Sequence, residues 1–222
     1  MKIELHAHTS ETSPCAHINA ARLVQMYEDA GYDAVVITDH YSKWVMEHNN
    51  IKDPQEFTDF FLKGYKSALL YSQDGNHTIK VLPGAEINLL ESPNDYLLYG
   101  ADKEFFYNNP LLFQMSLAEL YNLCHNNGIL LIQAHPYRAY CTPADIHLID
   151  GAEVYNGNPR HNSNNSKTYK WASENNMIMV SGSDFHEEED LAKGGIITET
   201  SFISIKELVE IIKAGNYSII EN

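Results

Sequence analysis

Residues 3–9 read IELHAHT, a short run in which His6 and His8 stand two positions apart. Side chains at positions i and i+2 of a strand point to the same face, so both imidazoles would point the same way if this run is the first strand. Two converging imidazoles suit a metal ion better than a packed core. Because one HxH pair is a weak signal alone, its interpretation depends on what recurs along the chain.

Four further polar motifs each end a predicted strand: TDH at 38–40, PGAE at 83–86, AHP at 134–136 and SDFH at 183–186. Several of the preceding runs, such as DAVVIT at 33–38, are continuously apolar, which is typical of strands buried on both faces. Amphipathic segments lie between the strands, and those with clear helical spacing or termination signals are predicted helices. They cover residues 20–30, 54–72, 117–126, 167–175 and 205–214.

This alternation predicts parallel βα units and an α/β fold. Polar residues at the ends of at least five strands converge more easily in a closed ring than in an open sheet, where they would gather at one switch point. No Pro- or Ser-rich linker interrupts the sequence. We therefore predict one barrel domain over residues 1–222, with its site at the C-terminal ends of the strands.

The charge balance restricts the class of partner. Thirty acidic residues against fifteen basic ones give a formal net charge of −15, which argues against binding to duplex nucleic acid. A small phosphorylated metabolite remains compatible, because bound cations would reverse the local field. Three cysteines, without a disulfide pattern, and the lack of an apolar signal region or membrane-length run predict a cytoplasmic protein that does not bind membranes.

Seven residues at predicted strand ends are candidate metal ligands. They are His6, His8, His40, Glu86, His135, Asp184 and His186. Imidazole and carboxylate donors suit zinc, manganese or iron. One ion does not need seven ligands, so we predict two or three divalent ions, with a carboxylate bridging two of them. Glu86 follows Pro-Gly at the end of an apolar strand, where a carboxylate is costly to bury unless it is paired with a positive charge.

Other catalytic designs lack their motifs. The sequence has no GxSxG, no GxxxxGK[ST] and no GxGxxG after a strand. Arg138 and Arg160 lie in loops beyond strand ends and are candidate phosphate-binding residues. Arg22 falls on the first predicted helix and is expected to be solvated.

Taken in order, HAHTS, TDH, PGAE, AHP and SDFH resemble the four-motif signature of the PHP (polymerase and histidinol phosphatase) superfamily, from residue 3 to about residue 195. The resemblance implies a distorted seven-stranded (β/α) barrel and a stand-alone metal-dependent phosphoesterase. By motif match, His6, His8, Glu86 and Asp184 resemble ligands of a first ion, with Glu86 bridging. His135 then resembles a ligand of a second ion, and His40 and His186 resemble ligands of a third. Asp39 resembles a residue that supports the ligands.

The sequence departs from the family pattern at two places. Family members commonly place His or Asp five or six residues after the second His of HxH, where this chain has Ser13 and Pro14, with Glu11, Cys15 and His17 nearby. A further His usually follows the bridging Glu, whereas here only Asp95 or Tyr96 is available. The ligands that complete the second and third positions therefore remain open.

We predict hydrolysis of a small phosphomonoester by a metal-bound hydroxide in a di- or trinuclear site, with Glu86, Asp184 and His186 as catalytic residues. The alternatives are an amidohydrolase-type metal hydrolase and a catalytically weakened metal-binding module. The sequence does not identify the phosphoester, the native metal or the oligomeric state.

Overall fold

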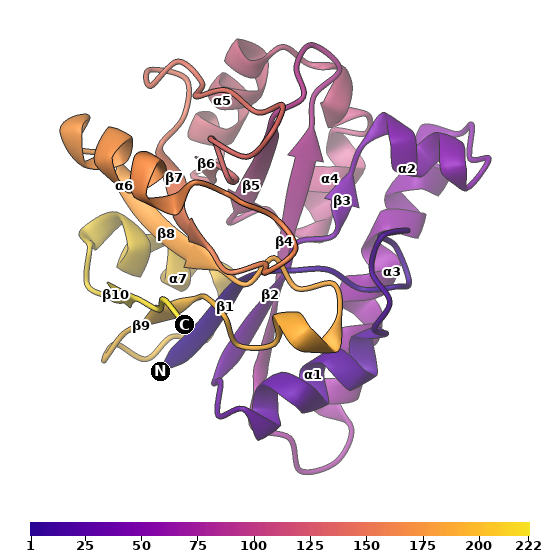
Figure 1. The fold of residues 1–222 in the computed structure, drawn as a ribbon. Coiled ribbons are helices and arrows are strands. Elements are labelled where there is room, and N and C mark those ends of the chain that lie inside the picture. The colour runs from indigo at the N-terminus through magenta and orange to yellow at the C-terminus, as the bar shows by residue number, and fades with distance from the viewer.

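A computed structural model describes residues 1–222 and shows an α/β barrel (Figure 1). Its sheet has the strand order β10-β9-β1-β2-β4-β5-β6-β7-β8, with β3 paired to β4 outside this path. The strand bounds are β1 Lys2–Ala7, β2 Ala34–Ile37, β3 His40–Tyr41, β4 Lys80–Asn88, β5 Asp95–Tyr99, β6 Leu130–Gln133, β7 Gly151–Asn156, β8 Ile178–Gly182, β9 Ile196–Ile197 and β10 Ser218–Ile219.

The ring closes where β1 meets the segment after β8. Ala7 forms a parallel bridge with Phe185, His8 N donates to Phe185 O at 3.0 Å, and Phe185 N donates to His6 O at 3.1 Å. Seven strands, β1, β2 and β4 to β8, therefore form the wall, as predicted. The closure also brings the first and last histidine motifs together.

The strands are not all parallel, so that part of the prediction was wrong. β5 runs antiparallel to both β4 and β6, and β9 runs antiparallel to β1 and β10. Asn88 and Asp95 are joined by a short turn, which suffices for an antiparallel pair, whereas a parallel pair needs a crossover of about a dozen residues. The reversal of β5 distorts the barrel and places Asp95, at the start of this strand, on the same end as the other strands' carboxyl termini.

The five predicted helices are present within a few residues of their expected bounds: α1 Ala20–Asp29, α3 Pro54–Gln73, α5 Leu117–Asn126, α6 Asn165–Glu174 and α7 Ile205–Ala214. Asp53 caps α3 by accepting Gln55 N and Glu56 N, and Ser116 and Glu119 form a capping box on α5. The sequence did not predict α2 Lys43–His48, α4 Lys103–Asn108 and the 3-10 turns η1 Leu112–Gln114 and η2 Glu188–Asp190.

Apolar side chains fill the barrel interior on the N-terminal side of the strand ends that carry the histidines. Leu5, Val36 and Leu97 belong to one buried cluster with residues of α7, and Tyr99 donates its hydroxyl to Leu5 O at 3.1 Å. Outside the ring, α1 and α3 pack on β2, and α3, α4 and α5 pack on the face of β4 to β6. The buried apolar layers hold the strand ends in place around the polar residues. None of the helices has the length and apolarity that a membrane span requires.

Candidate metal centre

Four of the predicted ligands meet in one buried group. His6 Nε2 lies 3.3 Å from Glu86 Oε1 and 3.5 Å from Asp184 Oδ1, and His8 Nε2 lies 3.4 Å from Glu86 Oε2 and 3.5 Å from Asp184 Oδ1. Ligands of a tetrahedral ion with bonds of roughly 2.1 Å are separated by about 3.4 Å. The spacing of His6, His8 and Glu86 therefore fits a single divalent ion between them, and Asp184 Oδ1 lies 3.5 Å from both imidazole nitrogens.

The imidazoles of this group are oriented for such an ion. His6 and His8 are fully buried, yet their Nε2 atoms have no hydrogen-bond partner. Their other ring nitrogens are occupied, His6 Nδ1 by Glu153 Oε1 at 2.8 Å and His8 Nδ1 by Ser13 Oγ at 3.4 Å. A buried nitrogen without a partner is costly, and a metal ligand whose second nitrogen is hydrogen-bonded is the usual arrangement at metal centres.

His135 and Asp95 form a second group. His135 Nε2 lies 3.2 Å from Glu86 Oε1 and 3.9 Å from Asp95 Oδ2, and Cys141 lies beside them. Tyr96, the other residue considered, is buried in the core on the opposite face of β5. Asp95 is thus the residue that accompanies His135.

His40 and His186 form a third group with His8. The His40 ring lies 4.3 Å and the His186 ring 4.4 Å from the His8 ring, centroid to centroid. Among the three loop residues considered, Cys15 lines the same pocket as His40 and His186. Glu11 instead accepts Ala20 N, and His17 lies near Glu187 at 3.6 Å with a largely exposed side chain.

Glu86 lies at the centre of all three groups. Its Oε1 faces His6 and His135, and its Oε2 faces His8 and His40, the latter at 2.9 Å. Burial alone would raise the pKa of Glu86, but the charges of His6 and His40 outweigh it and hold the pKa well below the usual range. Asp184 is held ionised in the same way by His6 and Arg138.

The pKa values of Asp95 and Cys15, which lie beside the predicted ligands, are also shifted. Burial, reinforced by the charge of Glu86, raises the pKa of Asp95 to about 6. For Cys15, burial would raise the pKa, but hydrogen bonds to His186 and His40 outweigh it and lower the pKa to about 6.

The backbone is strained at the same place. His135 and Asp184 have φ values of 30° and 52°, in the left-handed region that non-glycine residues rarely adopt. A Cβ on Gly182 would lie 2.4 Å from His6 Cβ, so β8 approaches β1 this closely only because residue 182 is glycine. Such strain concentrates at functional sites.

A pocket of about 260 Å³ opens onto the three groups. Arg138 lines it and donates from Nη2 to Asp184 Oδ2 at 2.6 Å and Asn156 Oδ1 at 2.8 Å, while its Nη1 has no partner in the protein. Arg160 also lines it, but its guanidinium is bound to Asp190 at 2.6 and 2.8 Å. His161, which the sequence analysis did not select, lies on the same wall.

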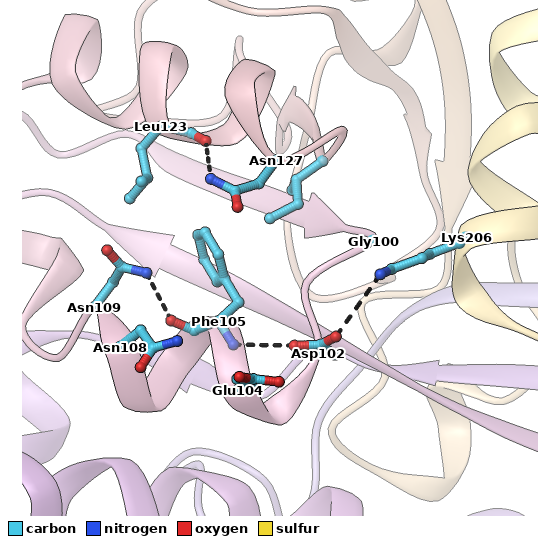
Figure 2. A pocket seen from close by; sticks show the side chains of 10 residues that line it. Gly100, Asp102, Glu104, Phe105, Asn108, Asn109, Leu123, Asn127 and Lys206 are labelled. Carbon is cyan, nitrogen blue, oxygen red and sulfur yellow. Dashed lines mark hydrogen bonds and ion pairs between the residues drawn. The ribbon is translucent and has the colours of Figure 1, made fainter.

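A larger pocket of about 480 Å³ lies elsewhere, between α4, α5 and α7 (Figure 2). It contains Asp102, which caps α4 and lies 3.9 Å from Lys206 Nζ. No histidine or cysteine lines it.

Comparison with known proteins agrees with this geometry. Residues 162–217 match the family model described as PHP-associated. The fold is similar to that of PsfC from Pseudomonas syringae, with a TM-score of 0.71 and 13% identity over 100% of this chain and 91% of that chain. It is also similar to a two-domain protein from Bacteroides vulgatus that contains a predicted PHP-like metal-dependent phosphoesterase, with a TM-score of 0.66 and 15% identity over 100% of this chain and 65% of that chain. The family model covers the C-terminal part of the chain, and the structural similarities show that the chain shares the fold of these proteins.

A protein described as a different kind of hydrolase shares this fold. An amidohydrolase from Chromobacterium violaceum is similar to this chain with a TM-score of 0.58 and 13% identity, over 100% of this chain and 98% of that chain. No curated protein sequence matches.

Relative to the PHP motif pattern, the structure brings all seven predicted ligands together and adds Asp95 and Cys15 beside them. Asp39 lies behind them, where it accepts Thr9 N at 2.6 Å and Ser13 Oγ at 2.8 Å. Glu153, which supports His6, was missed. A charged residue inside the predicted apolar strand GAEVYN was the available signal, because a buried carboxylate needs a partner.

Proposed function

We propose that this protein is a member of the PHP superfamily and a metal-dependent hydrolase that acts on a small phosphomonoester. The observation that carries the proposal is Glu86, a buried carboxylate whose two oxygens each face two imidazoles. A carboxylate in this position is suited to bridge two ions. Divalent ions bound there would supply an activated water and neutralise the charge that develops on a phosphoryl group.

The residues of the chain contribute binding and orientation. Arg138 has an unpartnered Nη1 beside Asp184, at the edge of the pocket, and a guanidinium in this position suits phosphate oxygens. Arg160 and His161 also line the pocket. His186 lies on the same wall, with Nδ1 at 2.8 Å from Asp184 O, so its Nε2 faces away from this carbonyl.

The size of the pocket and the net charge of the chain support a small substrate. A pocket of about 260 Å³ is smaller than the range of about 300–1,000 Å³ that is usual for pockets of drug-sized ligands. The net charge of −15 opposes a polyanionic duplex. We also propose a cytoplasmic location, which the three free cysteines support.

An amidohydrolase reaction is the second candidate, because a protein of that name shares the fold. A substrate panel separates the two. With Mn²⁺, Zn²⁺ or Fe²⁺ added, we expect the purified protein to hydrolyse p-nitrophenyl phosphate faster than bis(p-nitrophenyl) phosphate and to leave dihydroorotate unchanged. Turnover of the cyclic amide without turnover of the monoester would overturn the proposal. If neither is hydrolysed, the monoester proposal fails and the third alternative, a weakened metal-binding module, takes its place.

A further inference from the structure

Asp190, the last residue of the turn η2, is a fully buried carboxylate that accepts four hydrogen bonds. Its Oδ2 accepts His186 N and Glu187 N, both at 2.8 Å. Arg160 donates from Nη1 to Oδ1 at 2.6 Å and from Nη2 to Oδ2 at 2.8 Å. One carboxylate therefore joins the segment that carries His186 to the loop after β7 that carries Arg160.

The loop after β7 is fixed on a second side by Asn158. This residue is buried, donates from Nδ2 to Asp184 O at 2.9 Å, and accepts Arg160 N on Oδ1 at 3.0 Å. The backbone of Arg160 is thus held close to Asp184, a predicted ligand, while its guanidinium is held by Asp190. Buried polar residues therefore set both ends of the Arg160 side chain.

The acidic neighbours of Arg160 use only one edge of its guanidinium. A guanidinium presents two pairs of parallel N–H bonds, one from Nη1 and Nη2 and the other from Nε and Nη2. The first pair binds Asp190, and Nη1 also donates to Glu189 Oε1 at 3.2 Å. The edge formed by Nε and Nη2 is left for another acceptor. Such an edge matches two oxygens of a phosphoryl group, and Arg160 lines the pocket of the metal centre.

We propose that Asp190 is a positioning residue, which holds Arg160 so that the edge formed by Nε and Nη2 binds two oxygens of a phosphate monoester. Asp190 does not itself contact the substrate. This inference rests on the phosphoryl substrate of the proposed function but not on its hydrolysis. A guanidinium that is already oriented loses less freedom when the substrate binds, so the buried pair strengthens phosphoryl binding.

Binding of phenylphosphonate tests the proposal, because its P–C bond is not that of a phosphoester and binding is measured without turnover. Calorimetric titration of the metal-loaded full chain gives the Kd. In Asp190→Asn the remaining oxygen can keep the two backbone N–H bonds, whereas the NH₂ group faces Nη1 of Arg160. We expect the Kd to rise at least about tenfold, with the metal content per chain unchanged.

Further variants separate positioning from a general loss of structure. Arg160→Ala should raise the Kd by a similar factor, and Asp190→Asn added to it should raise the Kd no further, because Asp190 acts through Arg160. Arg160→Lys keeps a charge beside an intact Asp190 but has no planar edge, so it should also weaken binding. Glu189→Gln removes an exposed contact of the same Nη1 and is the matched control, with a Kd within about twofold of wild type.

An unchanged Kd in Asp190→Asn, a further rise when this change is added to Arg160→Ala, or a wild-type Kd in Arg160→Lys would overturn the proposal. A metal-loaded wild type that binds no phenylphosphonate would also overturn it. If Asp190→Asn does not fold, Arg160→Lys decides the outcome.

Turnover of p-nitrophenyl phosphate on the same samples separates this inference from the proposed function. Wild-type turnover with an unchanged Kd in Asp190→Asn defeats the positioning role alone. The expected pattern of Kd values without any turnover supports the positioning role and defeats the proposed reaction.

Discussion

His6 Nδ1 lies 2.8 Å from Glu153 Oε1, and both side chains are fully buried. The second oxygen of Glu153 accepts His135 N at 3.1 Å and Asn156 Nδ2 at 2.8 Å. One carboxylate therefore orients a ligand of the first group and holds the strained backbone of a ligand of the second. Carboxylates that receive the second nitrogen of a metal-binding histidine fix its ring and raise its basicity.

Glu153→Gln tests this support. The amide can accept from only one of the two sides, so the His6 ring loses its fixed orientation. We expect metal affinity to fall by about 10 to 100-fold, measured by competition with a chromophoric chelator. Glu210→Gln, at an exposed position of α7, should leave the affinity unchanged. An unaltered affinity in Glu153→Gln would show that Glu153 has only a packing role.

Glu86→Gln tests the bridge. An amide cannot offer two anionic oxygens to two ions, and its NH₂ group would face imidazole nitrogens. We expect kcat to fall by at least about two orders of magnitude while the circular dichroism spectrum is retained. Glu47→Gln, an exposed residue of α2, is the matched control. Near-normal kcat in Glu86→Gln would remove the bridge from the account.

The two arginines should behave differently. Arg160 contacts acidic residues and no predicted ligand side chain, so Arg160→Ala should raise KM more than it lowers kcat, the pattern of lost uniform binding. Steady-state kinetics with p-nitrophenyl phosphate measures both parameters. A fall in kcat at constant KM would assign Arg160 to the transition state.

Arg138 is paired with Asp184 in the buried site. Arg138→Ala leaves this carboxylate without its cationic partner, so we expect lower metal affinity as well as lower kcat/KM. Metal affinity is measured by the same chelator competition. If Arg138→Ala changes KM alone, its contact with Asp184 has no part in metal binding.

Glu28 gives a pH-dependent contribution to stability. It accepts Thr78 N at 2.6 Å and pairs with His77 Nδ1 at 2.6 Å, and mainly the His77 bond lowers its pKa to about 2 from 4.5. A lowered pKa contributes stability that is present above pH 4.5 and is lost as the pH falls toward 2.

Glu28→Gln should therefore reduce the free energy of unfolding by about 1 kcal/mol at pH 7, because the pair is partly solvated. The difference from wild type should shrink between pH 4.5 and pH 2. Urea unfolding at several pH values measures it. A difference that is constant over this range would mean that the charge of Glu28 does not stabilise the fold.

Local patterns in the sequence were sufficient to predict the barrel and the seven side chains that meet at the ends of its strands. The spacing of His6 and His8 on one strand and the polar residue after each apolar run report directly which strand ends face the site. Helix α3 was likewise predictable, because Asp53 and Pro54 mark its start in the sequence.

Features that depend on distant contacts were not predictable in this way. The loop that presents Cys15 is fixed by bonds to His186 and α3, and neither is visible in local spacing. The orientation of β5 follows from pairing on both sides. Glu153 left a readable signal as a charge within an apolar strand, but only the structure shows that His6 is its partner.

Stepwise reconstitution tests the central claim most directly. The chain is freed of metal by chelation, Mn²⁺ is returned in increments, and bound metal per chain and hydrolysis of p-nitrophenyl phosphate are measured on each sample. The account predicts no turnover without metal, and turnover that rises with occupancy in the wild type but not in Glu86→Gln. Turnover in the metal-free protein, or a fully loaded wild-type protein that hydrolyses no phosphomonoester, would contradict it.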